Sequence, residues 1–321
     1  MLDRRALLSA ASAFAAALAT GRPAAAQQAF SSLRMFIPAG PGGGWDGLGR
    51  AIEQVLRAAG KVGSFQFENV GGAGGAVGLP RFIARRGQGD TLMVGGAVMV
   101  GAILTNKSPV GLKDTTPIAR LTEEAGVIVV PASSPHQNIG QFMAALKANP
   151  GAMSIGGGSA GGTDHIALGL MLKAVGRNAR EGSYVAYAGG GPAQAAILGA
   201  QVAAGISGLS EFSEQVKAGR MRALATTGEK RTDPNIPTLK ESGFDVVATN
   251  WRGVFGAPAI NASQRAALVN LITEMHALPA WKELLVTRGW DDAFLVGDAF
   301  VKFIAEDTAA TEAVLKDLGL A

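Results

Sequence analysis

The sequence predicts an α/β protein of two lobes, each with a mostly parallel β-sheet flanked by helices. Two observations lead to this prediction: short apolar runs typical of strands alternate with helical patterns, and glycine-rich turns stand between them. A length of 321 residues favours two such lobes over one. In folds of this class the ligand lies at the carboxyl ends of the strands.

The individual elements follow from the apolar periodicity. Residues 33–38 predict a first strand that ends at Pro38, and residues 45–60 predict a helix with Leu48 and Ile52 at helical spacing. Further strands are predicted at 64–70, 91–96, 126–131, 153–155, 184–187, 202–207, 221–227 and 245–258. Further helices are predicted at 79–86, 136–151, 164–176, 192–200, 263–278 and 298–319.

Residues 1–26 have the composition of an export signal peptide. Two adjacent arginines precede the apolar run Ala6–Ala19, and small residues predict cleavage near Ala26. The run is shorter than the roughly 20 residues that cross a bilayer, which argues against a membrane anchor. The paired arginines indicate the twin-arginine route, but Asp3 stands where that motif more often has Ser or Thr, so Sec export stays open. We expect the mature protein in the periplasm.

The composition excludes several function classes. The chain has no cysteine, hence no disulfide, no thiolate metal site and no cysteine nucleophile. The three histidines, His136, His165 and His276, have no metal-binding spacing. Of the formal charge of +4, residues 1–26 carry +2 (three arginines against one aspartate), and the remaining +2 does not indicate nucleic acid. We therefore expect no cofactor, no metal and no nucleic-acid partner.

Glycine is the outlier in the composition, with 45 of 321 residues, about twice the usual ~7%. Four junctions share the order strand, glycines, helix: Ala39–Asp46, Gly71–Gly78, Gly156–Asp164 and Ala188–Pro192. Glycines let backbone N–H groups approach a ligand closely, and the following helix adds unpaired N–H groups and a positive dipole end. Such junctions bind anions without lysine or arginine, and four of them in one chain predict that at least two line a common cleft.

One of these junctions also matches two enzyme motifs. Residues 156–161 fit the dinucleotide motif G-x-G-x-x-G, and residues 157–161 fit the hydrolase motif G-x-S-x-G. The strand that follows ends without the acidic residue that a dinucleotide ribose needs. A nucleophilic Ser159 would need a base on a later loop, whereas His165 follows too closely and His276 lies in a helical pattern. An exported α/β hydrolase-like enzyme acting on a small organic acid is kept as the alternative function.

The glycine junctions and their surroundings resemble a known family, the solute receptors of tripartite tricarboxylate transporters, also called Bug-type extracytoplasmic binding proteins. The resemblance covers essentially the whole mature chain and rests on the stretches IPAGPGGGWDGLGRAI, ENVGGAGGAVG, YVAYAGGGPAQAAILG and KAGRMRALATTGEKR. A resemblance to the tricarboxylate-binding subgroup in particular rests on the stretches TNKS, TTPIARLTEEAGVIVVP, GGGSAGGTDHIALGLML, GEKR, PTLKESG and TNWRG. The chain departs from the common pattern at Ala188, where that pattern has Lys, and at Arg252, where it has an aromatic residue.

The resemblance implies a periplasmic-binding-protein-like fold of type II with no enzymatic activity. Residues 28–130 and 238–321 would form the first lobe, and residues 131–237 the second. The lobes would close on a citrate-like tri- or dicarboxylate and deliver it to the transporter's membrane subunits. A sensor as the partner, in place of a transporter, stays open. We expect a monomer.

The resemblance and the glycine junctions together name the candidate ligand-binding residues. Trp45 either walls the cleft or packs under its loop, and for Asp46 and Asp164 capping of a helix is the favoured role. His165 either faces a carboxylate or makes a structural hydrogen bond, and Arg252 either grips a second or third carboxylate or is an ordinary exposed arginine. The full candidate set is Gly42, Gly43, Gly44, Trp45, Asp46, Gly158, Ser159, Thr163, Asp164, His165, Tyr187, Gly190, Ser207 and Arg252.

Overall fold

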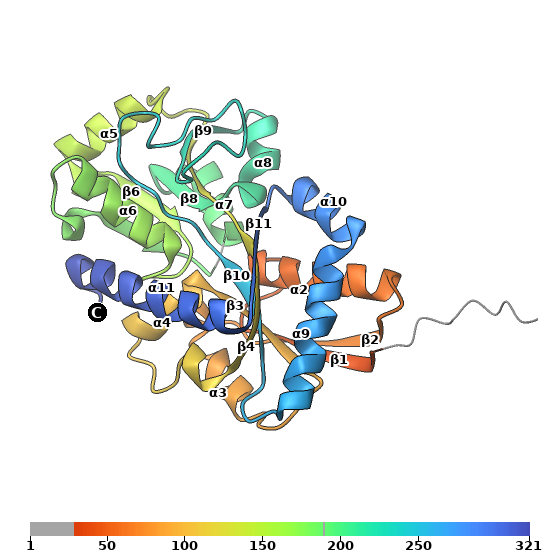
Figure 1. The fold of residues 1–321 in the computed structure, drawn as a ribbon. Helices are drawn as coiled ribbons and strands as arrows, with labels where there is room; N and C mark the ends of the chain where they lie inside the picture. The colour runs from red at the N-terminus through yellow and green to blue at the C-terminus, as the bar shows by residue number, and fades with distance from the viewer. Residues whose placement is uncertain (1–28, 189) are drawn as a thin grey trace, which may run out of the picture.

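The computed structural model describes residues 29–188 and 190–321, so the predicted export signal lies outside the described residues. These residues form two separate β-sheets, each covered by helices (Figure 1). The first sheet has six strands and the second has five. The predicted α/β fold with two helix-flanked sheets is confirmed.

The first sheet has the strand order β11-β4-β10-β3-β1-β2. Four of its strands run in one direction, and β10 and β11 run against them. The strands are β1 (Phe30–Ile37), β2 (Val62–Asn69), β3 (Thr91–Gly96), β4 (Thr116–Glu123), β10 (Arg252–Gly256) and β11 (Asp291–Val296). Its helices are α2 (Gly44–Ala58), α3 (Gly78–Ile83), α4 (Ala97–Thr105), α9 (Ala262–Ala277), α10 (Pro279–Arg288) and α11 (Gly297–Leu318).

The second sheet has the strand order β7-β6-β8-β5-β9, and within it β5 alone runs against the other strands. The strands are β5 (Gly126–Pro131), β6 (Ser154–Gly157), β7 (Ser183–Ala186), β8 (Ala204–Gly208) and β9 (Met221–Thr226). Its helices are α5 (Ile139–Ala148), α6 (Thr163–Ala174), α7 (Gly190–Leu198) and α8 (Leu209–Lys217). Both sheets are therefore mixed, although most strands of each run in parallel directions.

Several element predictions need correction. The long strand predicted at 245–258 is limited to β10, because residues 246–250 pack on the second sheet and cross to the first. Five elements of the structure were not predicted from the sequence: β4, α4, α8, α10 and β11. The helix α4 lacks a polar face, and β11 begins with two aspartates, so neither shows the alternation of apolar and polar residues on which prediction depends.

The chain crosses between the two sheets at residues 124–125 and returns at 249–250. The two crossing segments pair with each other, because the N–H of Glu124 donates to Asn250 O (3.2 Å) and the N–H of Asn250 donates to Glu124 O (2.8 Å). Strand β5 pairs only with β8 and β9, and it spans the predicted lobe boundary at 130/131. The lobe boundaries themselves stay a prediction.

The C-terminal helix α11 forms another link between the halves. It begins beside β11 of the first sheet, and its end packs on α6 of the second half (Figure 1). Asp317 forms an ion pair with Lys173 of α6, with 2.6 Å between Oδ2 and Nζ. The side chain of Leu318 fills the space above Gly169 of α6, where a Cβ would collide with it.

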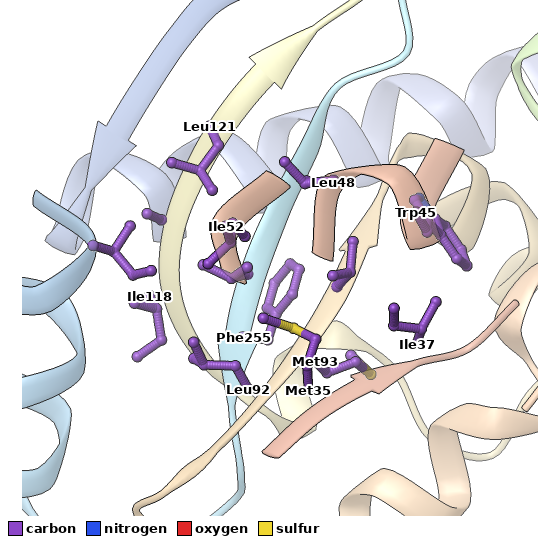
Figure 2. Packing of buried hydrophobic residues seen from close by; sticks show 14 of the residues in the cluster. Met35, Ile37, Trp45, Leu48, Ile52, Leu92, Met93, Ile118, Leu121 and Phe255 are labelled. Carbon is purple, nitrogen blue, oxygen red and sulfur yellow. The ribbon is translucent and has the colours of Figure 1, made fainter. Parts of the chain in front are cut away.

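The main hydrophobic core lies between α2 and the first sheet. Leu48 and Ile52 of α2 are fully buried and point towards the strands, where they meet Met93 and Phe255 (Figure 2). The helix forms because apolar residues recur every three or four positions, while Arg50 and Arg57 face outward. In the described residues, no helix combines the length and apolar character that crossing a membrane would require.

Replacing Trp281 by alanine tests this core. The side chain lies on α10 and is fully buried, so Trp281→Ala is expected to lower the free energy of unfolding by about 3–5 kcal/mol. The matched control is Val286→Ala on the same helix, where the side chain is 82% exposed and the expected change stays within about 0.5 kcal/mol. Urea unfolding of both variants measures the difference, and equal effects would contradict this packing.

Candidate ligand-binding site

A cleft of about 570 Å³ lies between the two halves of the molecule. This volume is in the range of small-molecule binding sites, roughly 300–1,000 Å³. Loops that follow the carboxyl ends of β1, β2, β6, β7 and β8 line it, together with Asn250 and Arg252 at the start of β10. Both sheets therefore contribute to one concave site, at the strand ends where α/β folds bind ligands.

Most of the candidate residues meet in this cleft. The eleven that line it are Gly42, Gly43, Gly44, Trp45, Gly158, Ser159, Thr163, Asp164, Gly190, Ser207 and Arg252. Asp46 and His165 lie behind the loops, and Tyr187 packs against a hydrophobic cluster of the second half. Trp45 does both things that were considered for it, since it lines the cleft and is only 7% exposed within the core. The part of these residues in ligand binding stays a prediction.

Asp46 holds the loop before α2 in shape. Its Oδ2 accepts a hydrogen bond from the N–H of Gly42 at 3.0 Å, and its Oδ1 accepts one from the side chain of Asn69 at 3.1 Å. Asp46 is in the first turn of α2 and is buried. The N-cap of α2 is Gly43 and that of α6 is Gly162, neither with a side-chain cap, so the helix-capping role favoured for Asp46 and Asp164 is wrong. Asp46 instead ties the preceding loop. The N–H of Gly42 is thereby used inside the protein.

The loop before α6 is built in a similar way. Oδ2 of Asp164 accepts a hydrogen bond from the N–H of Gly158 at 2.8 Å, and the hydroxyl of Tyr184 donates to the carbonyl of Gly158 at 2.9 Å. Nδ1 of His165 accepts from the N–H of Gly161 at 3.2 Å, and its ring stacks on Tyr184 with 4.2 Å between the centroids. His165 therefore makes the structural hydrogen bond, the second of its two considered roles.

Burial changes the protonation of this loop. It raises the pKa of Asp164 to about 7, against the hydrogen bond from Gly158, and the charge of Glu211 raises it further. Burial lowers the pKa of His165 to about 4. The imidazole is thus neutral at pH 7, and since Nδ1 is an acceptor, its proton is on Nε2. Among the described residues, Arg252 is the cationic side chain that lines the cleft, and His165 does not line it.

Arg252 forms a buried ion pair with Glu124 at the base of the cleft. Its Nη1 donates to Oε2 of Glu124 at 2.7 Å, and the two side chains are 4% and 1% exposed. The other carboxylate oxygen of Glu124 accepts hydrogen bonds from the N–H and the hydroxyl of Ser210, at 2.9 and 2.5 Å. Ser210 belongs to α8 of the second half, so the pair joins both halves.

Two glycines leave the space that this ion pair fills. A Cβ at Gly44 would lie 2.8 Å from Nη2 of Arg252, and a Cβ at Gly208 would lie 2.6 Å from Oε1 of Glu124. Both distances are too short for a side chain at either position. These glycines therefore make room for charged side chains of the protein as well as for the close approach of a ligand.

Three polar side chains at the site, those of Glu124, Glu211 and Asn250, were not predicted from the sequence. Glu211 lines the cleft and its Oε2 accepts a hydrogen bond from the hydroxyl of Ser207. Its position four residues after the predicted strand 202–207 was the available signal, because residues just beyond strand ends face the cleft. Glu124 and Asn250 gave no such signal, since their role depends on the pairing of the two crossing segments.

The arrangement supports the binding of a small molecule. The first turns of α2 and α6 line the cleft, and the N–H groups of a first turn have no partner within their own helix, which suits an anion. In residues 29–188 and 190–321, no group of three or more His, Asp or Glu side chains is placed to hold a metal ion. Nδ1 of His165 accepts a hydrogen bond from the N–H of Gly161. Among the described residues, no hydrogen bond joins His165 to Ser159.

Two helix-covered sheets with a ligand-sized cleft between them define a two-lobed solute-binding protein. The model of the family described as "Tripartite tricarboxylate transporter family receptor" matches residues 60–320. The chain belongs to this family of receptors, which are binding proteins of the periplasm and not enzymes. The resemblance found in the sequence is thereby confirmed.

Curated relatives agree with this membership. Protein BugT of Bordetella pertussis is 26% identical over 89% of each chain. A relative from Bordetella bronchiseptica is 30% identical over 86% of this chain and 83% of its own. A protein encoded in the gbd 5′ region of Cupriavidus necator is 27% identical, and the match spans 65% of this chain and 64% of that protein's length.

Solved structures show the same fold. A periplasmic transporter structure has 25% identity and a TM-score of 0.80, over 89% of this chain and 96% of its own. MatC from Rhodopseudomonas palustris, with bound malate, has 21% identity and a TM-score of 0.76, over 88% and 98%. Rpa4515 of R. palustris, with adipate, has 21% identity and a TM-score of 0.81, over 90% and 97%.

Replacing Asp164 by asparagine tests the pKa of this carboxyl. Its folded pKa of about 7 exceeds the ordinary 3.8, so between these values the folded protein holds a proton that the unfolded chain releases. The stability that comes from protonating Asp164 is full at low pH and is lost as the pH rises through about 7. Asp164→Asn keeps an acceptor for Gly158 and removes the charge. The variant's melting temperature should therefore exceed that of wild type more at pH 8 than at pH 5; a difference independent of pH would refute the shift.

Removing Arg252 tests the buried ion pair. Arg252→Met leaves the carboxylate of Glu124 buried without its cation, which is expected to lower the free energy of unfolding by about 3–5 kcal/mol. The double variant Arg252→Met with Glu124→Gln should regain a large part of this loss. Arg34→Met is the control, since Arg34 pairs with Asp90 at the exposed surface and its loss should cost under about 1 kcal/mol. Chemical denaturation measures all three, and equal losses at the two arginines would contradict the assignment.

Proposed function

We propose that the protein binds a citrate-like di- or tricarboxylate in the cleft between its lobes and delivers it to the membrane subunits of a tripartite tricarboxylate transporter. The observation that carries this proposal is the pair of glycine loops before α2 and α6, whose helix N-termini face one cleft from opposite halves. Backbone N–H groups at helix N-termini bind carboxylates, and these loops are held in shape by hydrogen bonds to Asp46 and Asp164 of the protein itself.

Each half of the site contributes different groups. The first lobe offers the first turn of α2 around Gly43 and Gly44, and the second offers the turn of Gly158 and the hydroxyls of Ser159 and Thr163. A carboxylate that contacts both halves stabilises the closed arrangement over an open one, which is how a ligand drives closure. The hinge in this proposal is the paired crossing at residues 124–125 and 249–250.

The structural relatives support a carboxylate as the ligand class. MatC holds malate and Rpa4515 holds adipate, and both share the fold of this chain. We propose a monomeric receptor of the periplasm, exported with the signal at residues 1–26. A transporter is preferred over a sensor as the partner because the family is that of transporter receptors.

Calorimetric titration of the mature protein tests the proposal. Citrate, tricarballylate, malate and adipate are the ligands, and glycerol is the uncharged control. We expect at least one acid to bind with a dissociation constant of about 1 μM, because a few charge-assisted hydrogen bonds of about 1.5–3 kcal/mol each reach about −8 kcal/mol. The ligand should be recovered unchanged by NMR. An absence of heat with every carboxylate would rule the proposal out.

A hydroxyl variant locates the binding in the cleft. Ser159→Ala removes a hydroxyl at the cleft surface and should weaken the binding of the best acid about fivefold, the equivalent of one hydrogen bond of about 1 kcal/mol. Ser263→Ala on the exposed surface of α9 is the matched control and should bind like wild type. Equal affinities for both variants would place the ligand elsewhere.

A further inference from the structure

The side chain of Glu211 lies inside the cleft, on the first turn of α8. Its Oε2 accepts a hydrogen bond from the hydroxyl of Ser207, and the backbone N–H of Gly44 lies near enough to lower the pKa of the Glu211 carboxyl. A Cβ at Gly190 would overlap Oε2 of Glu211, so the glycine leaves the space that the carboxylate fills. Groups from β8, α2 and α7 therefore surround this one carboxylate.

These surroundings are the ones that a bound anion needs. Gly44 is the first residue of α2 and Gly190 is the first residue of α7, where N–H groups have no partner within the helix. A carboxylate at such a position is stabilised by the N–H groups and by the helix dipole. In this protein the carboxylate at that position belongs to Glu211, from the half of the molecule opposite α2.

Among the described residues that line the cleft, the one cationic side chain, that of Arg252, already has a partner. The charged side chains that line it in the described residues are Asp164, Glu211 and Arg252. The guanidinium of Arg252 is already paired with the buried Glu124 at 2.7 Å. Burial raises the pKa of Glu211, the Ser207 hydroxyl and Arg252 oppose this, and the charge of Glu124 adds to it. An additional anion beside Glu211 would meet a second negative charge, while the nearest cation, Arg252, is already paired with Glu124.

We propose that Glu211 permanently occupies one anion position of the cleft, so that the receptor accepts acids with two carboxylates and discriminates against a third. The inference rests on the proposed function, because it concerns the ligand of the same cleft. It narrows that ligand from tri- and dicarboxylates to dicarboxylates. Glu211 is thus a specificity-determining residue, and Ser207 holds it in place.

A matched pair of acids tests this inference. Glutarate and tricarballylate share a three-carbon chain and differ by one carboxylate. Wild type is expected to bind glutarate at least tenfold more tightly than tricarballylate in calorimetric titrations at pH 7.5. Glu211→Gln keeps an acceptor for Ser207 and removes the negative charge, so the preference for glutarate should fall at least tenfold.

Two further variants separate charge from folding. Glu214→Gln removes a carboxylate from the exposed side of the same helix, where it pairs with Lys217 at 3.0 Å, and should keep the wild-type preference. Glu211→Ala removes the charge by a different side chain and should reduce the preference in the same direction, and melting curves report whether each variant is folded.

The outcomes are distinct. A wild-type preference for tricarballylate, or an unchanged ratio in both Glu211 variants, would overturn the inference while the proposed function stands. Wild-type protein that binds neither these acids nor any of the others would overturn both.

Discussion

The buried ion pair of Arg252 and Glu124 is the interaction on which the meeting of the two halves depends. Glu124 lies in the first crossing segment, exchanges backbone hydrogen bonds with Asn250 of the second, and also accepts from Ser210 at the start of α8. Because an unpaired charge in this environment is costly, both halves have to keep their groups beside it. The pair therefore sets where the crossing segments, α8 and the first turn of α2 lie relative to one another.

The same principle extends into the cleft, where acidic side chains of the protein shape the loops. Asp46 and Asp164 each accept from an N–H of the loop before their own helix, and Glu211 lies between the two halves. A loop held in this way loses little conformational entropy when a ligand binds. The groups left for the ligand are the remaining N–H groups of the helix first turns and the hydroxyls of Ser159 and Thr163.

The sequence was sufficient for the fold class and for the loops that line the cleft, because both depend on local patterns. Alternating strands and helices predict the sheets, and glycines between them predict which loops meet at the strand ends. The direction of β10, the roles of Glu124 and Asn250, and the choice between two roles for His165 depend on contacts between distant segments. The roles predicted for the glycines were incomplete for the same reason. Gly44 adjoins Arg252 and Gly208 adjoins Glu124, which are distant from them in the chain.

Those glycines and the side chains above them have a consequence for how such a protein changes over generations. Each glycine and its charged neighbour share one volume, so a larger residue at position 44 requires the end of Arg252 to shift or a shorter residue to replace it. The same dependence links position 208 with Glu124 and position 190 with Glu211. Substitutions at a glycine and at its charged neighbour are therefore expected to occur together within a lineage. A relative that lacks one of these glycines should also lack the charged side chain beside it.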